Sequence, residues 1–323
     1  MDETYDVVVV GGGAAGLSGA VALSRARRSV LVVDAGSPRN APAGHVHNYL
    51  GREGTPPGEL LAAGRAELAG YGGEVVVDTV VAAEQVDGGF RVSLAGGRSV
   101  RARRLLVATG LVDELPAVPG LAPRWGRDVL HCPYCHGYEV RDRAIGVLAT
   151  GPMAVHQTLL FRQLSDDVTL FLHTAPDLTA DEREQLAALG VAVVEGEVAA
   201  VEVADDRLTG LRLRSGEVVP RDAVVVAPRF VARAEVLSSL GVDAVEQEMA
   251  GVVVGTAVPA DPTGATAVPG VWVAGNVADM RAQVMSSAAA GLSAGAAINA
   301  DLVAEDARRA VIAHRERTAA RAG

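Results

Sequence analysis

The chain has 323 residues, about half of them apolar, and a formal net charge of −10 at pH 7. That length supplies a sizeable core and predicts two domains, while the negative charge argues against nucleic acid as a partner. No apolar run is long enough to span a membrane and the N-terminus lacks the basic region of a signal peptide, so we expect a cytoplasmic protein.

The first 34 residues predict a dinucleotide-binding βαβ unit. A strand at Tyr5–Val10 leads into Gly11-Gly12-Gly13-Ala14-Ala15-Gly16, a helix reaches about Arg28, and a second strand at 30–33 ends in Asp34. Gly11 permits the tight turn, and Gly13 lets a pyrophosphate approach the backbone. Gly16 lets the helix pack on the strand, and Asp34 can accept hydrogen bonds from ribose hydroxyls.

Two further segments favour FAD over NAD. These are Leu105-Leu106-Val107-Ala108-Thr109-Gly110 and Val271-Trp272-Val273-Ala274-Gly275-Asn276, and with Asp34 they resemble the FAD-binding segments of two-domain flavoprotein disulfide reductases. A second βαβ unit is predicted between them, with strands at 145–148 and 168–172, a turn at Gly151 and a helix at 153–164. We therefore expect an α/β protein with two Rossmann-like domains: an FAD-binding domain at 1–113 and 238–323, and an inserted domain at 114–237. The tail from Ala304 predicts a charged, exposed helix.

The chain's two cysteines stand together in Cys132-Pro133-Tyr134-Cys135-His136. A C-x-x-C pair stabilises one thiolate and favours disulfide exchange, for which His136 could supply or remove the proton. A structural disulfide and the c-type haem attachment sequence are alternatives. Zinc is a third, but His131 to His136 is too compressed for the usual pair of ligand dyads, so we expect no metal site.

Taken together, these ordered motifs resemble the low-molecular-weight thioredoxin reductase family over nearly the whole chain. The resemblance implies a homodimer in which Cys135 lies against the flavin and Cys132 faces the substrate. It also implies a helix beginning near Ala282 that points Gln283 and Val284 at the flavin pyrimidine edge.

Three positions depart from that family. His136 replaces the acidic residue that follows the second cysteine, and Asn276 replaces the acidic residue of the final FAD motif, where an amide can still bond the ribityl chain. The inserted unit reads Ala149-Thr150-Gly151-Pro152-Met153-Ala154, which lacks one glycine and one amide for a pyrophosphate, and His173-Thr174-Ala175-Pro176 lacks the arginines that would hold a 2′-phosphate. These departures predict a decayed NADPH site.

With these departures, the 132–139 segment and Asp34-Ala35-Gly36-Ser37-Pro38-Arg39-Asn40 resemble the dithiol oxidases of the gliotoxin, holomycin and romidepsin pathways, the holomycin type most. The resemblance implies FAD-dependent oxidation of a small dithiol, with dioxygen as acceptor and hydrogen peroxide as product. Its expected cofactor-binding residues include Ala35, Arg39, Asn40, His47 and Asn48. His136 is the candidate base, or else a structural histidine, and His45 and His47 are weaker candidates for lining the cleft. An NAD(P)H-dependent reductase and a flavin-bound redox sensor stay open as alternatives.

Overall fold

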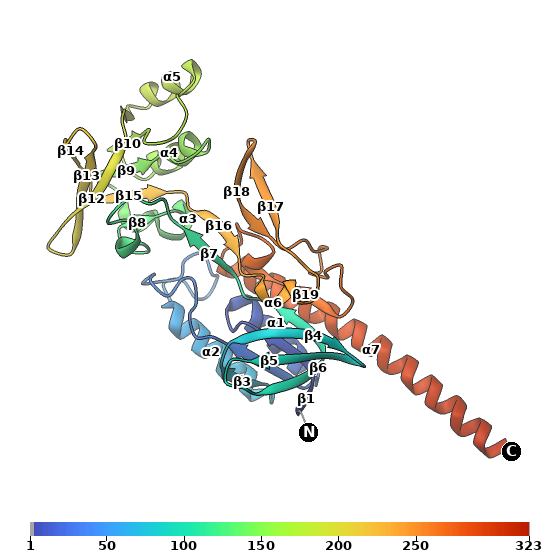
Figure 1. Ribbon diagram of the computed structural model, residues 1–323. Helices are drawn as coiled ribbons and strands as arrows, with labels where there is room; N and C mark the ends of the chain where they lie inside the picture. The colour runs from blue at the N-terminus through green and yellow to red at the C-terminus, as the bar shows by residue number, and fades with distance from the viewer. Residues whose placement is uncertain (1–2, 323) are drawn as a thin grey trace.

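The computed structural model describes residues 3–322 (Figure 1). Its largest sheet has seven strands in the order β3-β2-β1-β6-β5-β4, with β19 also paired to β6. Because β19 comes from the far end of the chain and runs parallel to β6, one sheet contains strands from both ends of the sequence. The bounds are β1 Glu3–Val10, β2 Val30–Asp34, β3 Glu74–Val77, β4 Val80–Val86, β5 Gly89–Leu94, β6 Ser99–Val107 and β19 Val271–Val273.

A second sheet of five parallel strands has the order β11-β10-β9-β15-β8. A three-stranded antiparallel sheet, β12-β13-β14, packs against it through apolar side chains. The bounds are β8 Val129–Leu130, β9 Ile145–Leu148, β10 Val168–Phe171, β11 Ala192–Val194, β12 Val198–Ala204, β13 Arg207–Leu213, β14 Val218–Pro220 and β15 Ala223–Val226.

Two antiparallel strands connect these regions. Figure 1 shows β7 (Leu111–Glu114) and β16 (Arg229–Ala232) running between the larger sheet and the smaller one, and they join β17 (Val245–Met249) and β18 (Val252–Ala257) in a four-stranded sheet. The domain limits at 113/114 and 237/238 stay a prediction.

Helices cover these sheets and carry part of the cavity described below. Their bounds are α1 Ala14–Arg25, α2 Pro57–Gly70, α3 Pro133–His136, α4 Ala154–Arg162, α5 Ala180–Ala188, α6 Glu235–Ser238 and α7 Val284–Ala322, with short 3-10 turns η1 Ala122–Arg124, η2 Tyr138–Val140 and η3 Gly275–Val277. None of the helices within 3–322 combines the length and apolarity needed to cross a bilayer.

Both predicted βαβ units are present as β1-α1-β2 and β9-α4-β10, each with parallel strands, which confirms the predicted fold class. The differences lie at element ends. The first helix stops at Arg25, before the predicted Arg28, because Arg27 takes a positive φ of 65° that a right-handed helix excludes. The tail from Ala304 is the outer part of α7, which Figure 1 shows projecting beyond the rest of the chain.

Helices α1 and α7 cross at unusually close range because glycines meet at the crossing. A Cβ on Gly291 would lie 1.9 Å from the carbonyl oxygen of Ala15, and one on Gly295 would lie 2.8 Å from that of Gly19. No larger side chain fits such a backbone contact. The first turns of α1 and α7, which begin far apart in the sequence, are therefore held together at one end of the large sheet.

Candidate active site

A cavity of about 1320 Å³ lies where the carboxyl ends of β1, β2 and β6 face the two cysteines. This is where open parallel sheets place their ligands. Nearly all the predicted site residues line it: Gly11, Gly13, Ala14, Ala15, Asp34, Ala35, Arg39, Asn40, His47, Ala108, Thr109, Gly110, Cys132, Cys135, His136, Gly275, Asn276, Gln283 and Val284. Two do not. Gly16 is buried in the helix packing, and Asn48 lies in the contact with the redox segment described below.

The glycine turn after β1 has the geometry of a dinucleotide cradle. Gly11 has a φ of +103°, and a Cβ there would lie 2.5 Å from the carbonyl oxygen of Ala108. Gly16 must also lack a side chain, because its Cβ would lie 1.9 Å from the Gly11 carbonyl oxygen. A Cβ on Gly13, by contrast, would meet nothing within 4 Å and would occupy the open space at the start of α1. The residues present therefore fit a dinucleotide whose pyrophosphate approaches Gly13.

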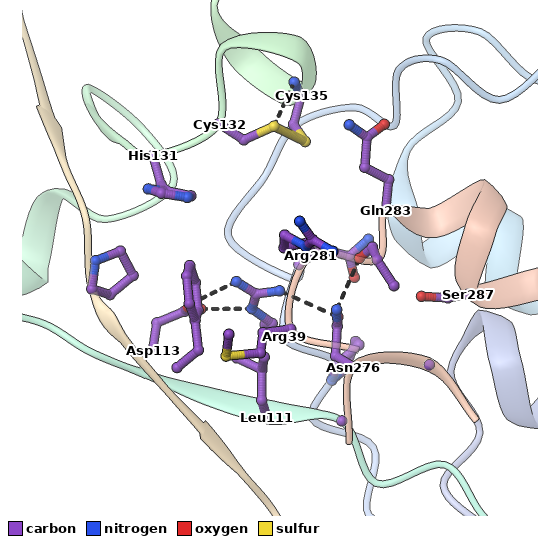
Figure 2. Close-up of a pocket in the computed structure, with 18 of the residues that line it drawn as sticks. Arg39, Leu111, Asp113, His131, Cys132, Cys135, Asn276, Arg281, Gln283 and Ser287 are labelled. Atoms are coloured by element: carbon purple, nitrogen blue, oxygen red, sulfur yellow. Dashed lines mark hydrogen bonds and ion pairs between the residues drawn. A yellow bond between two sulfur atoms is a disulfide. The ribbon is translucent and has the colours of Figure 1, made fainter. Parts of the chain in front are cut away.

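Arg39 is the centre of a polar network on the floor of the cavity. Its guanidinium donates to both carboxylate oxygens of Asp113, at 2.8 and 2.6 Å, and to Oδ1 of Asn276 at 3.2 Å (Figure 2). It also lies over the ring of Phe230, 5.5 Å from the centroid. The sequence analysis did not identify Asp113 or Phe230, because neither belongs to a motif. Both residues lie close to Arg39 because β7 pairs with β16.

Asn276 bonds to protein at both ends of its amide. While Oδ1 accepts from Arg39, Nδ2 donates to the carbonyl oxygens of Asp279 at 3.0 Å and Ala282 at 2.8 Å. A carboxylate has no hydrogen to donate to these carbonyls. The amide thus holds the segment that leads into α7. The sequence analysis predicted only a hydrogen bond from Asn276 to a ribityl chain.

The two cysteines form a disulfide within and just before α3. Cys132 is the N-cap residue, and its sulfur accepts from the backbone N–H of Cys135 at 3.2 Å. Figure 2 shows the disulfide on one side of the cavity and the Arg39 network on the other, and in this view the amide of Gln283 lies beside the disulfide. Within residues 3–322 no group of three or more histidine, cysteine or acidic side chains could hold a metal ion.

His131 is a cavity residue that the sequence analysis did not select. Its Nδ1 lies 3.1 Å from the carbonyl oxygen of Val226, and its ring meets Phe230 edge-on at 5.2 Å. Burial lowers the pKa of His131, so the ring is neutral near pH 7. Gln157 fixes the same residue by donating to its carbonyl oxygen at 2.9 Å. Only its place before Cys132 could have drawn attention to it.

His136, at the end of α3, is half-buried and lines the same cavity. Burial is the main cause that lowers its pKa; Glu139 opposes the shift, and His47 and His45 add to it. A neutral imidazole at pH 7 can accept a proton, as the predicted base must. The structure brings His136 near His45 and His47, which lie more than 80 positions earlier in the sequence.

Near the turn after β9, two polar side chains bond to the protein's own backbone, and the decayed NADPH site stays a prediction. Ala149 is buried, and the hydroxyl of Thr150 donates to the carbonyl oxygen of Ala227 at 3.2 Å. After β10, His173 takes a positive φ of 47°, and its Nδ1 accepts from the backbone N–H of Val198 at 3.1 Å. That imidazole serves the fold at a position where an arginine would bind phosphate.

Comparisons with known proteins agree with this geometry. Residues 5–295 match the family model described as pyridine nucleotide-disulphide oxidoreductase. Two curated relatives are thioredoxin reductase tcpT of Claviceps purpurea (strain 20.1) and thioredoxin reductase sirT of Leptosphaeria maculans, each 30% identical. The alignments cover 93% and 94% of this chain and 95% of each relative.

Two solved structures are similar along almost their whole length. The crystal structure of HlmI is 49% identical with a TM-score of 0.87, covering 95% of both chains. An oxidoreductase from Agrobacterium tumefaciens is 35% identical with a TM-score of 0.86, covering 94% of this chain and 99% of the other. These similarities confirm the predicted resemblance to thioredoxin reductase-like proteins.

Proposed function

Because the chain belongs to the pyridine nucleotide-disulphide oxidoreductase family, an oxidoreductase family of flavoproteins, we propose that it is an FAD-dependent dithiol oxidase. Its substrate is a small dithiol of natural-product biosynthesis, which it converts to an intramolecular disulfide. Dioxygen is the final acceptor and hydrogen peroxide the second product. We also propose that it acts in the cytoplasm as a homodimer.

One observation supports this proposal: the disulfide shares a cavity with an open dinucleotide cradle, while the second nucleotide turn lacks the first glycine and the arginines that would bind phosphate. Cys132, Cys135 and Gly13 line one space. His173 and Thr150, at the second site, bond to backbone groups of their own sheet region. Electrons therefore have a route between substrate sulfur and a flavin, whereas a reducing nucleotide has no well-formed site.

The disulfide exchange begins at Cys132, the sulfur that the family resemblance turns toward the substrate. A substrate thiolate attacks Cys132, the bond between the cysteines breaks, and Cys135 leaves as a thiolate. The second substrate thiolate then attacks the substrate sulfur of the mixed disulfide, which closes the product ring and releases Cys132 as a thiolate. Two electrons have passed from substrate to protein, and the substrate has lost two protons.

His136 accepts one of those protons, because its lowered pKa leaves the imidazole neutral near pH 7. Cys132 is the exchanging sulfur and Cys135 the one that faces the cofactor, as the family resemblance implies. FAD would be held by the Gly11–Gly16 turn, Asp34 and the Asn276 turn, and when bound it supplies a two-electron acceptor that dioxygen reoxidises.

The test is anaerobic reduction of the purified yellow protein by dithiothreitol, NADPH and NADH in parallel, followed by admission of air. We expect rapid bleaching by the dithiol, far slower bleaching by either nucleotide, and peroxide formation in air. Fast, saturable bleaching by NADPH would make the chain a reductase. Bleaching by the dithiol with no turnover in air would instead favour a redox sensor.

A further inference from the structure

The loop between β2 and α2 reaches across the cavity and holds the redox segment. Asn48 donates from Nδ2 to the carbonyl oxygen of Tyr134, between the two cysteines, at 2.5 Å. Next to it, His47 lies with Nε2 3.3 Å from a carboxylate oxygen of Glu139, which follows α3. These two contacts join residues more than 80 positions apart in the sequence.

His47 is held between two carboxylates. Its Nδ1 lies 2.5 Å from Glu53 of its own loop, opposite the contact with Glu139, and its side chain is 21% exposed. Glu53 also accepts from the backbone N–H of Asn48 at 2.9 Å, and both contacts lower the pKa of that carboxyl group. An antiparallel β-bridge between Val46 and Thr55 closes the loop, so backbone hydrogen bonds fix the turn that carries the imidazole of His47.

We propose that His47 is a positioning residue of the redox centre. By bridging Glu53 and Glu139, it anchors the segment around α3. It also limits the electrostatic effect of the Glu139 carboxylate on the imidazole of His136. The inference rests on the proposed function, because it assigns His47 an effect on the base of that reaction. Its ring touches the carboxylates, and it acts on the reacting sulfurs only through the redox segment.

The groups around His47 and Glu139 predict that substitutions of these two residues have opposite effects on the protonation of His136. Around His47 lie Glu53 and His45 from its own loop, with Glu139 and His136 from the redox segment. Glu139 favours the protonated form of His136, and His47 disfavours it. Removing His47 frees Glu139 to favour a charged His136, whereas removing the charge of Glu139 has the reverse effect.

The experiment measures the rate at which dithiothreitol reduces the FAD-loaded protein without oxygen, by flavin absorbance between pH 5 and 9. A base works only when deprotonated, so the acid limb of this profile reports His136. We expect His47→Gln to move that limb up by roughly half a pH unit to one unit, and Glu139→Gln to move it down by a similar amount. The ionisation of the dithiothreitol thiols affects every variant equally, so it cancels when the pH profiles of the variants are compared with that of the wild type.

Asn48→Gly is the matched control, since it removes the other contact between the loop and the redox segment without changing a charge. Glycine also accepts the positive φ of 58° at this position. We expect it to alter the rate by a similar factor at every pH, with the limb unmoved. Unmoved limbs in both charge variants, or shifts in the same direction, would overturn the role of His47 while leaving the oxidase proposal intact. Failure of dithiothreitol to reduce the wild-type protein at any pH would overturn both.

Discussion

Arg39 and Asp113 form a two-pronged ion pair that ties the loop after β2 to strand β7. The bonds run from Nε to Oδ2 at 2.8 Å and from Nη2 to Oδ1 at 2.6 Å, and the Asp113 side chain is only 7% exposed. A planar guanidinium matches a carboxylate in this way, whereas an ammonium does not. The pair fixes one wall of the flavin cavity to the connection between the two parts of the chain.

Arg39→Met should therefore lower the free energy of unfolding by about 2 kcal/mol, because it leaves a buried carboxylate without its partner. The loss is below the ~3–5 kcal/mol typical of fully buried pairs, since Arg39 is 31% exposed. The double variant Arg39→Met/Asp113→Asn should recover part of that loss. Denaturant unfolding of the FAD-free proteins checks both, and a double variant no more stable than the single one would argue against the stranded charge.

Gly13→Val should yield a folded but colourless protein. The new Cβ points into open space, with no protein atom beyond its chain neighbours within 4 Å, yet the side chain occupies the place where a pyrophosphate must approach. Gly151→Val is the control. That glycine lies in the turn between β9 and α4 of the second βαβ unit, and it also has nothing within 4 Å of its Cβ position. We expect the control to keep its flavin absorbance. Equal FAD content in the two variants would contradict the assignment of the cradle.

The two cysteines should behave differently when each is replaced. Cys132→Ser leaves Cys135 as a free thiolate facing the flavin and should give a long-wavelength charge-transfer band. Cys135→Ser should give none, and both variants should lose dithiol turnover. Absorbance spectra of the FAD-loaded proteins at pH 8 decide the matter, and a band in the Cys135 variant alone would reverse the two roles.

His136→Ala should keep FAD and the disulfide but slow dithiol oxidation by roughly 10² at pH 7. The deficit should shrink as pH rises, because substrate thiols then ionise without a base. Since burial lowers the pKa of His136, the wild-type rate should hold through neutral pH and decline only below the ordinary titration range of histidine. Steady-state oxygen consumption from pH 5.5 to 9 measures this, and a wild-type rate in the alanine variant would make His136 structural.

Asn276→Asp, which restores the acidic residue of the reductases, should weaken FAD binding and stability here. The change removes both N–H donors to the carbonyls of Asp279 and Ala282 and sets a negative charge beside them. Loss of such bonds costs about 1–3 kcal/mol, part of which a closer contact with Arg39 would offset. Titration of the FAD-free variant with FAD gives the affinity, and tighter binding than wild type would show that the amide does not shape the approach to α7.

The sequence predicted the features that depend on local order along the chain. The strand at 145–148 has the predicted bounds, and the glycine turn, Asp34 and the cysteine pair reach one cavity as their motifs imply. It could not predict contacts made by pairing between distant strands. Asp113 and Phe230 come to Arg39 through the β7–β16 ladder, and His131 gains its partner Val226 from the end of β15. Such partners stand at no fixed spacing along the sequence, so no motif indicates them.

The glycine crossing of α1 and α7 also has a consequence for biosynthesis. The flavin cradle needs β19 and the first turns of α7, so it cannot close until residues beyond 291 have left the ribosome. Every strand of the five-stranded sheet precedes residue 227, and that sheet can assemble on the nascent chain. Cofactor capture is therefore a late event in synthesis, and a chain truncated before Gly291 should fold its redox segment yet emerge without colour.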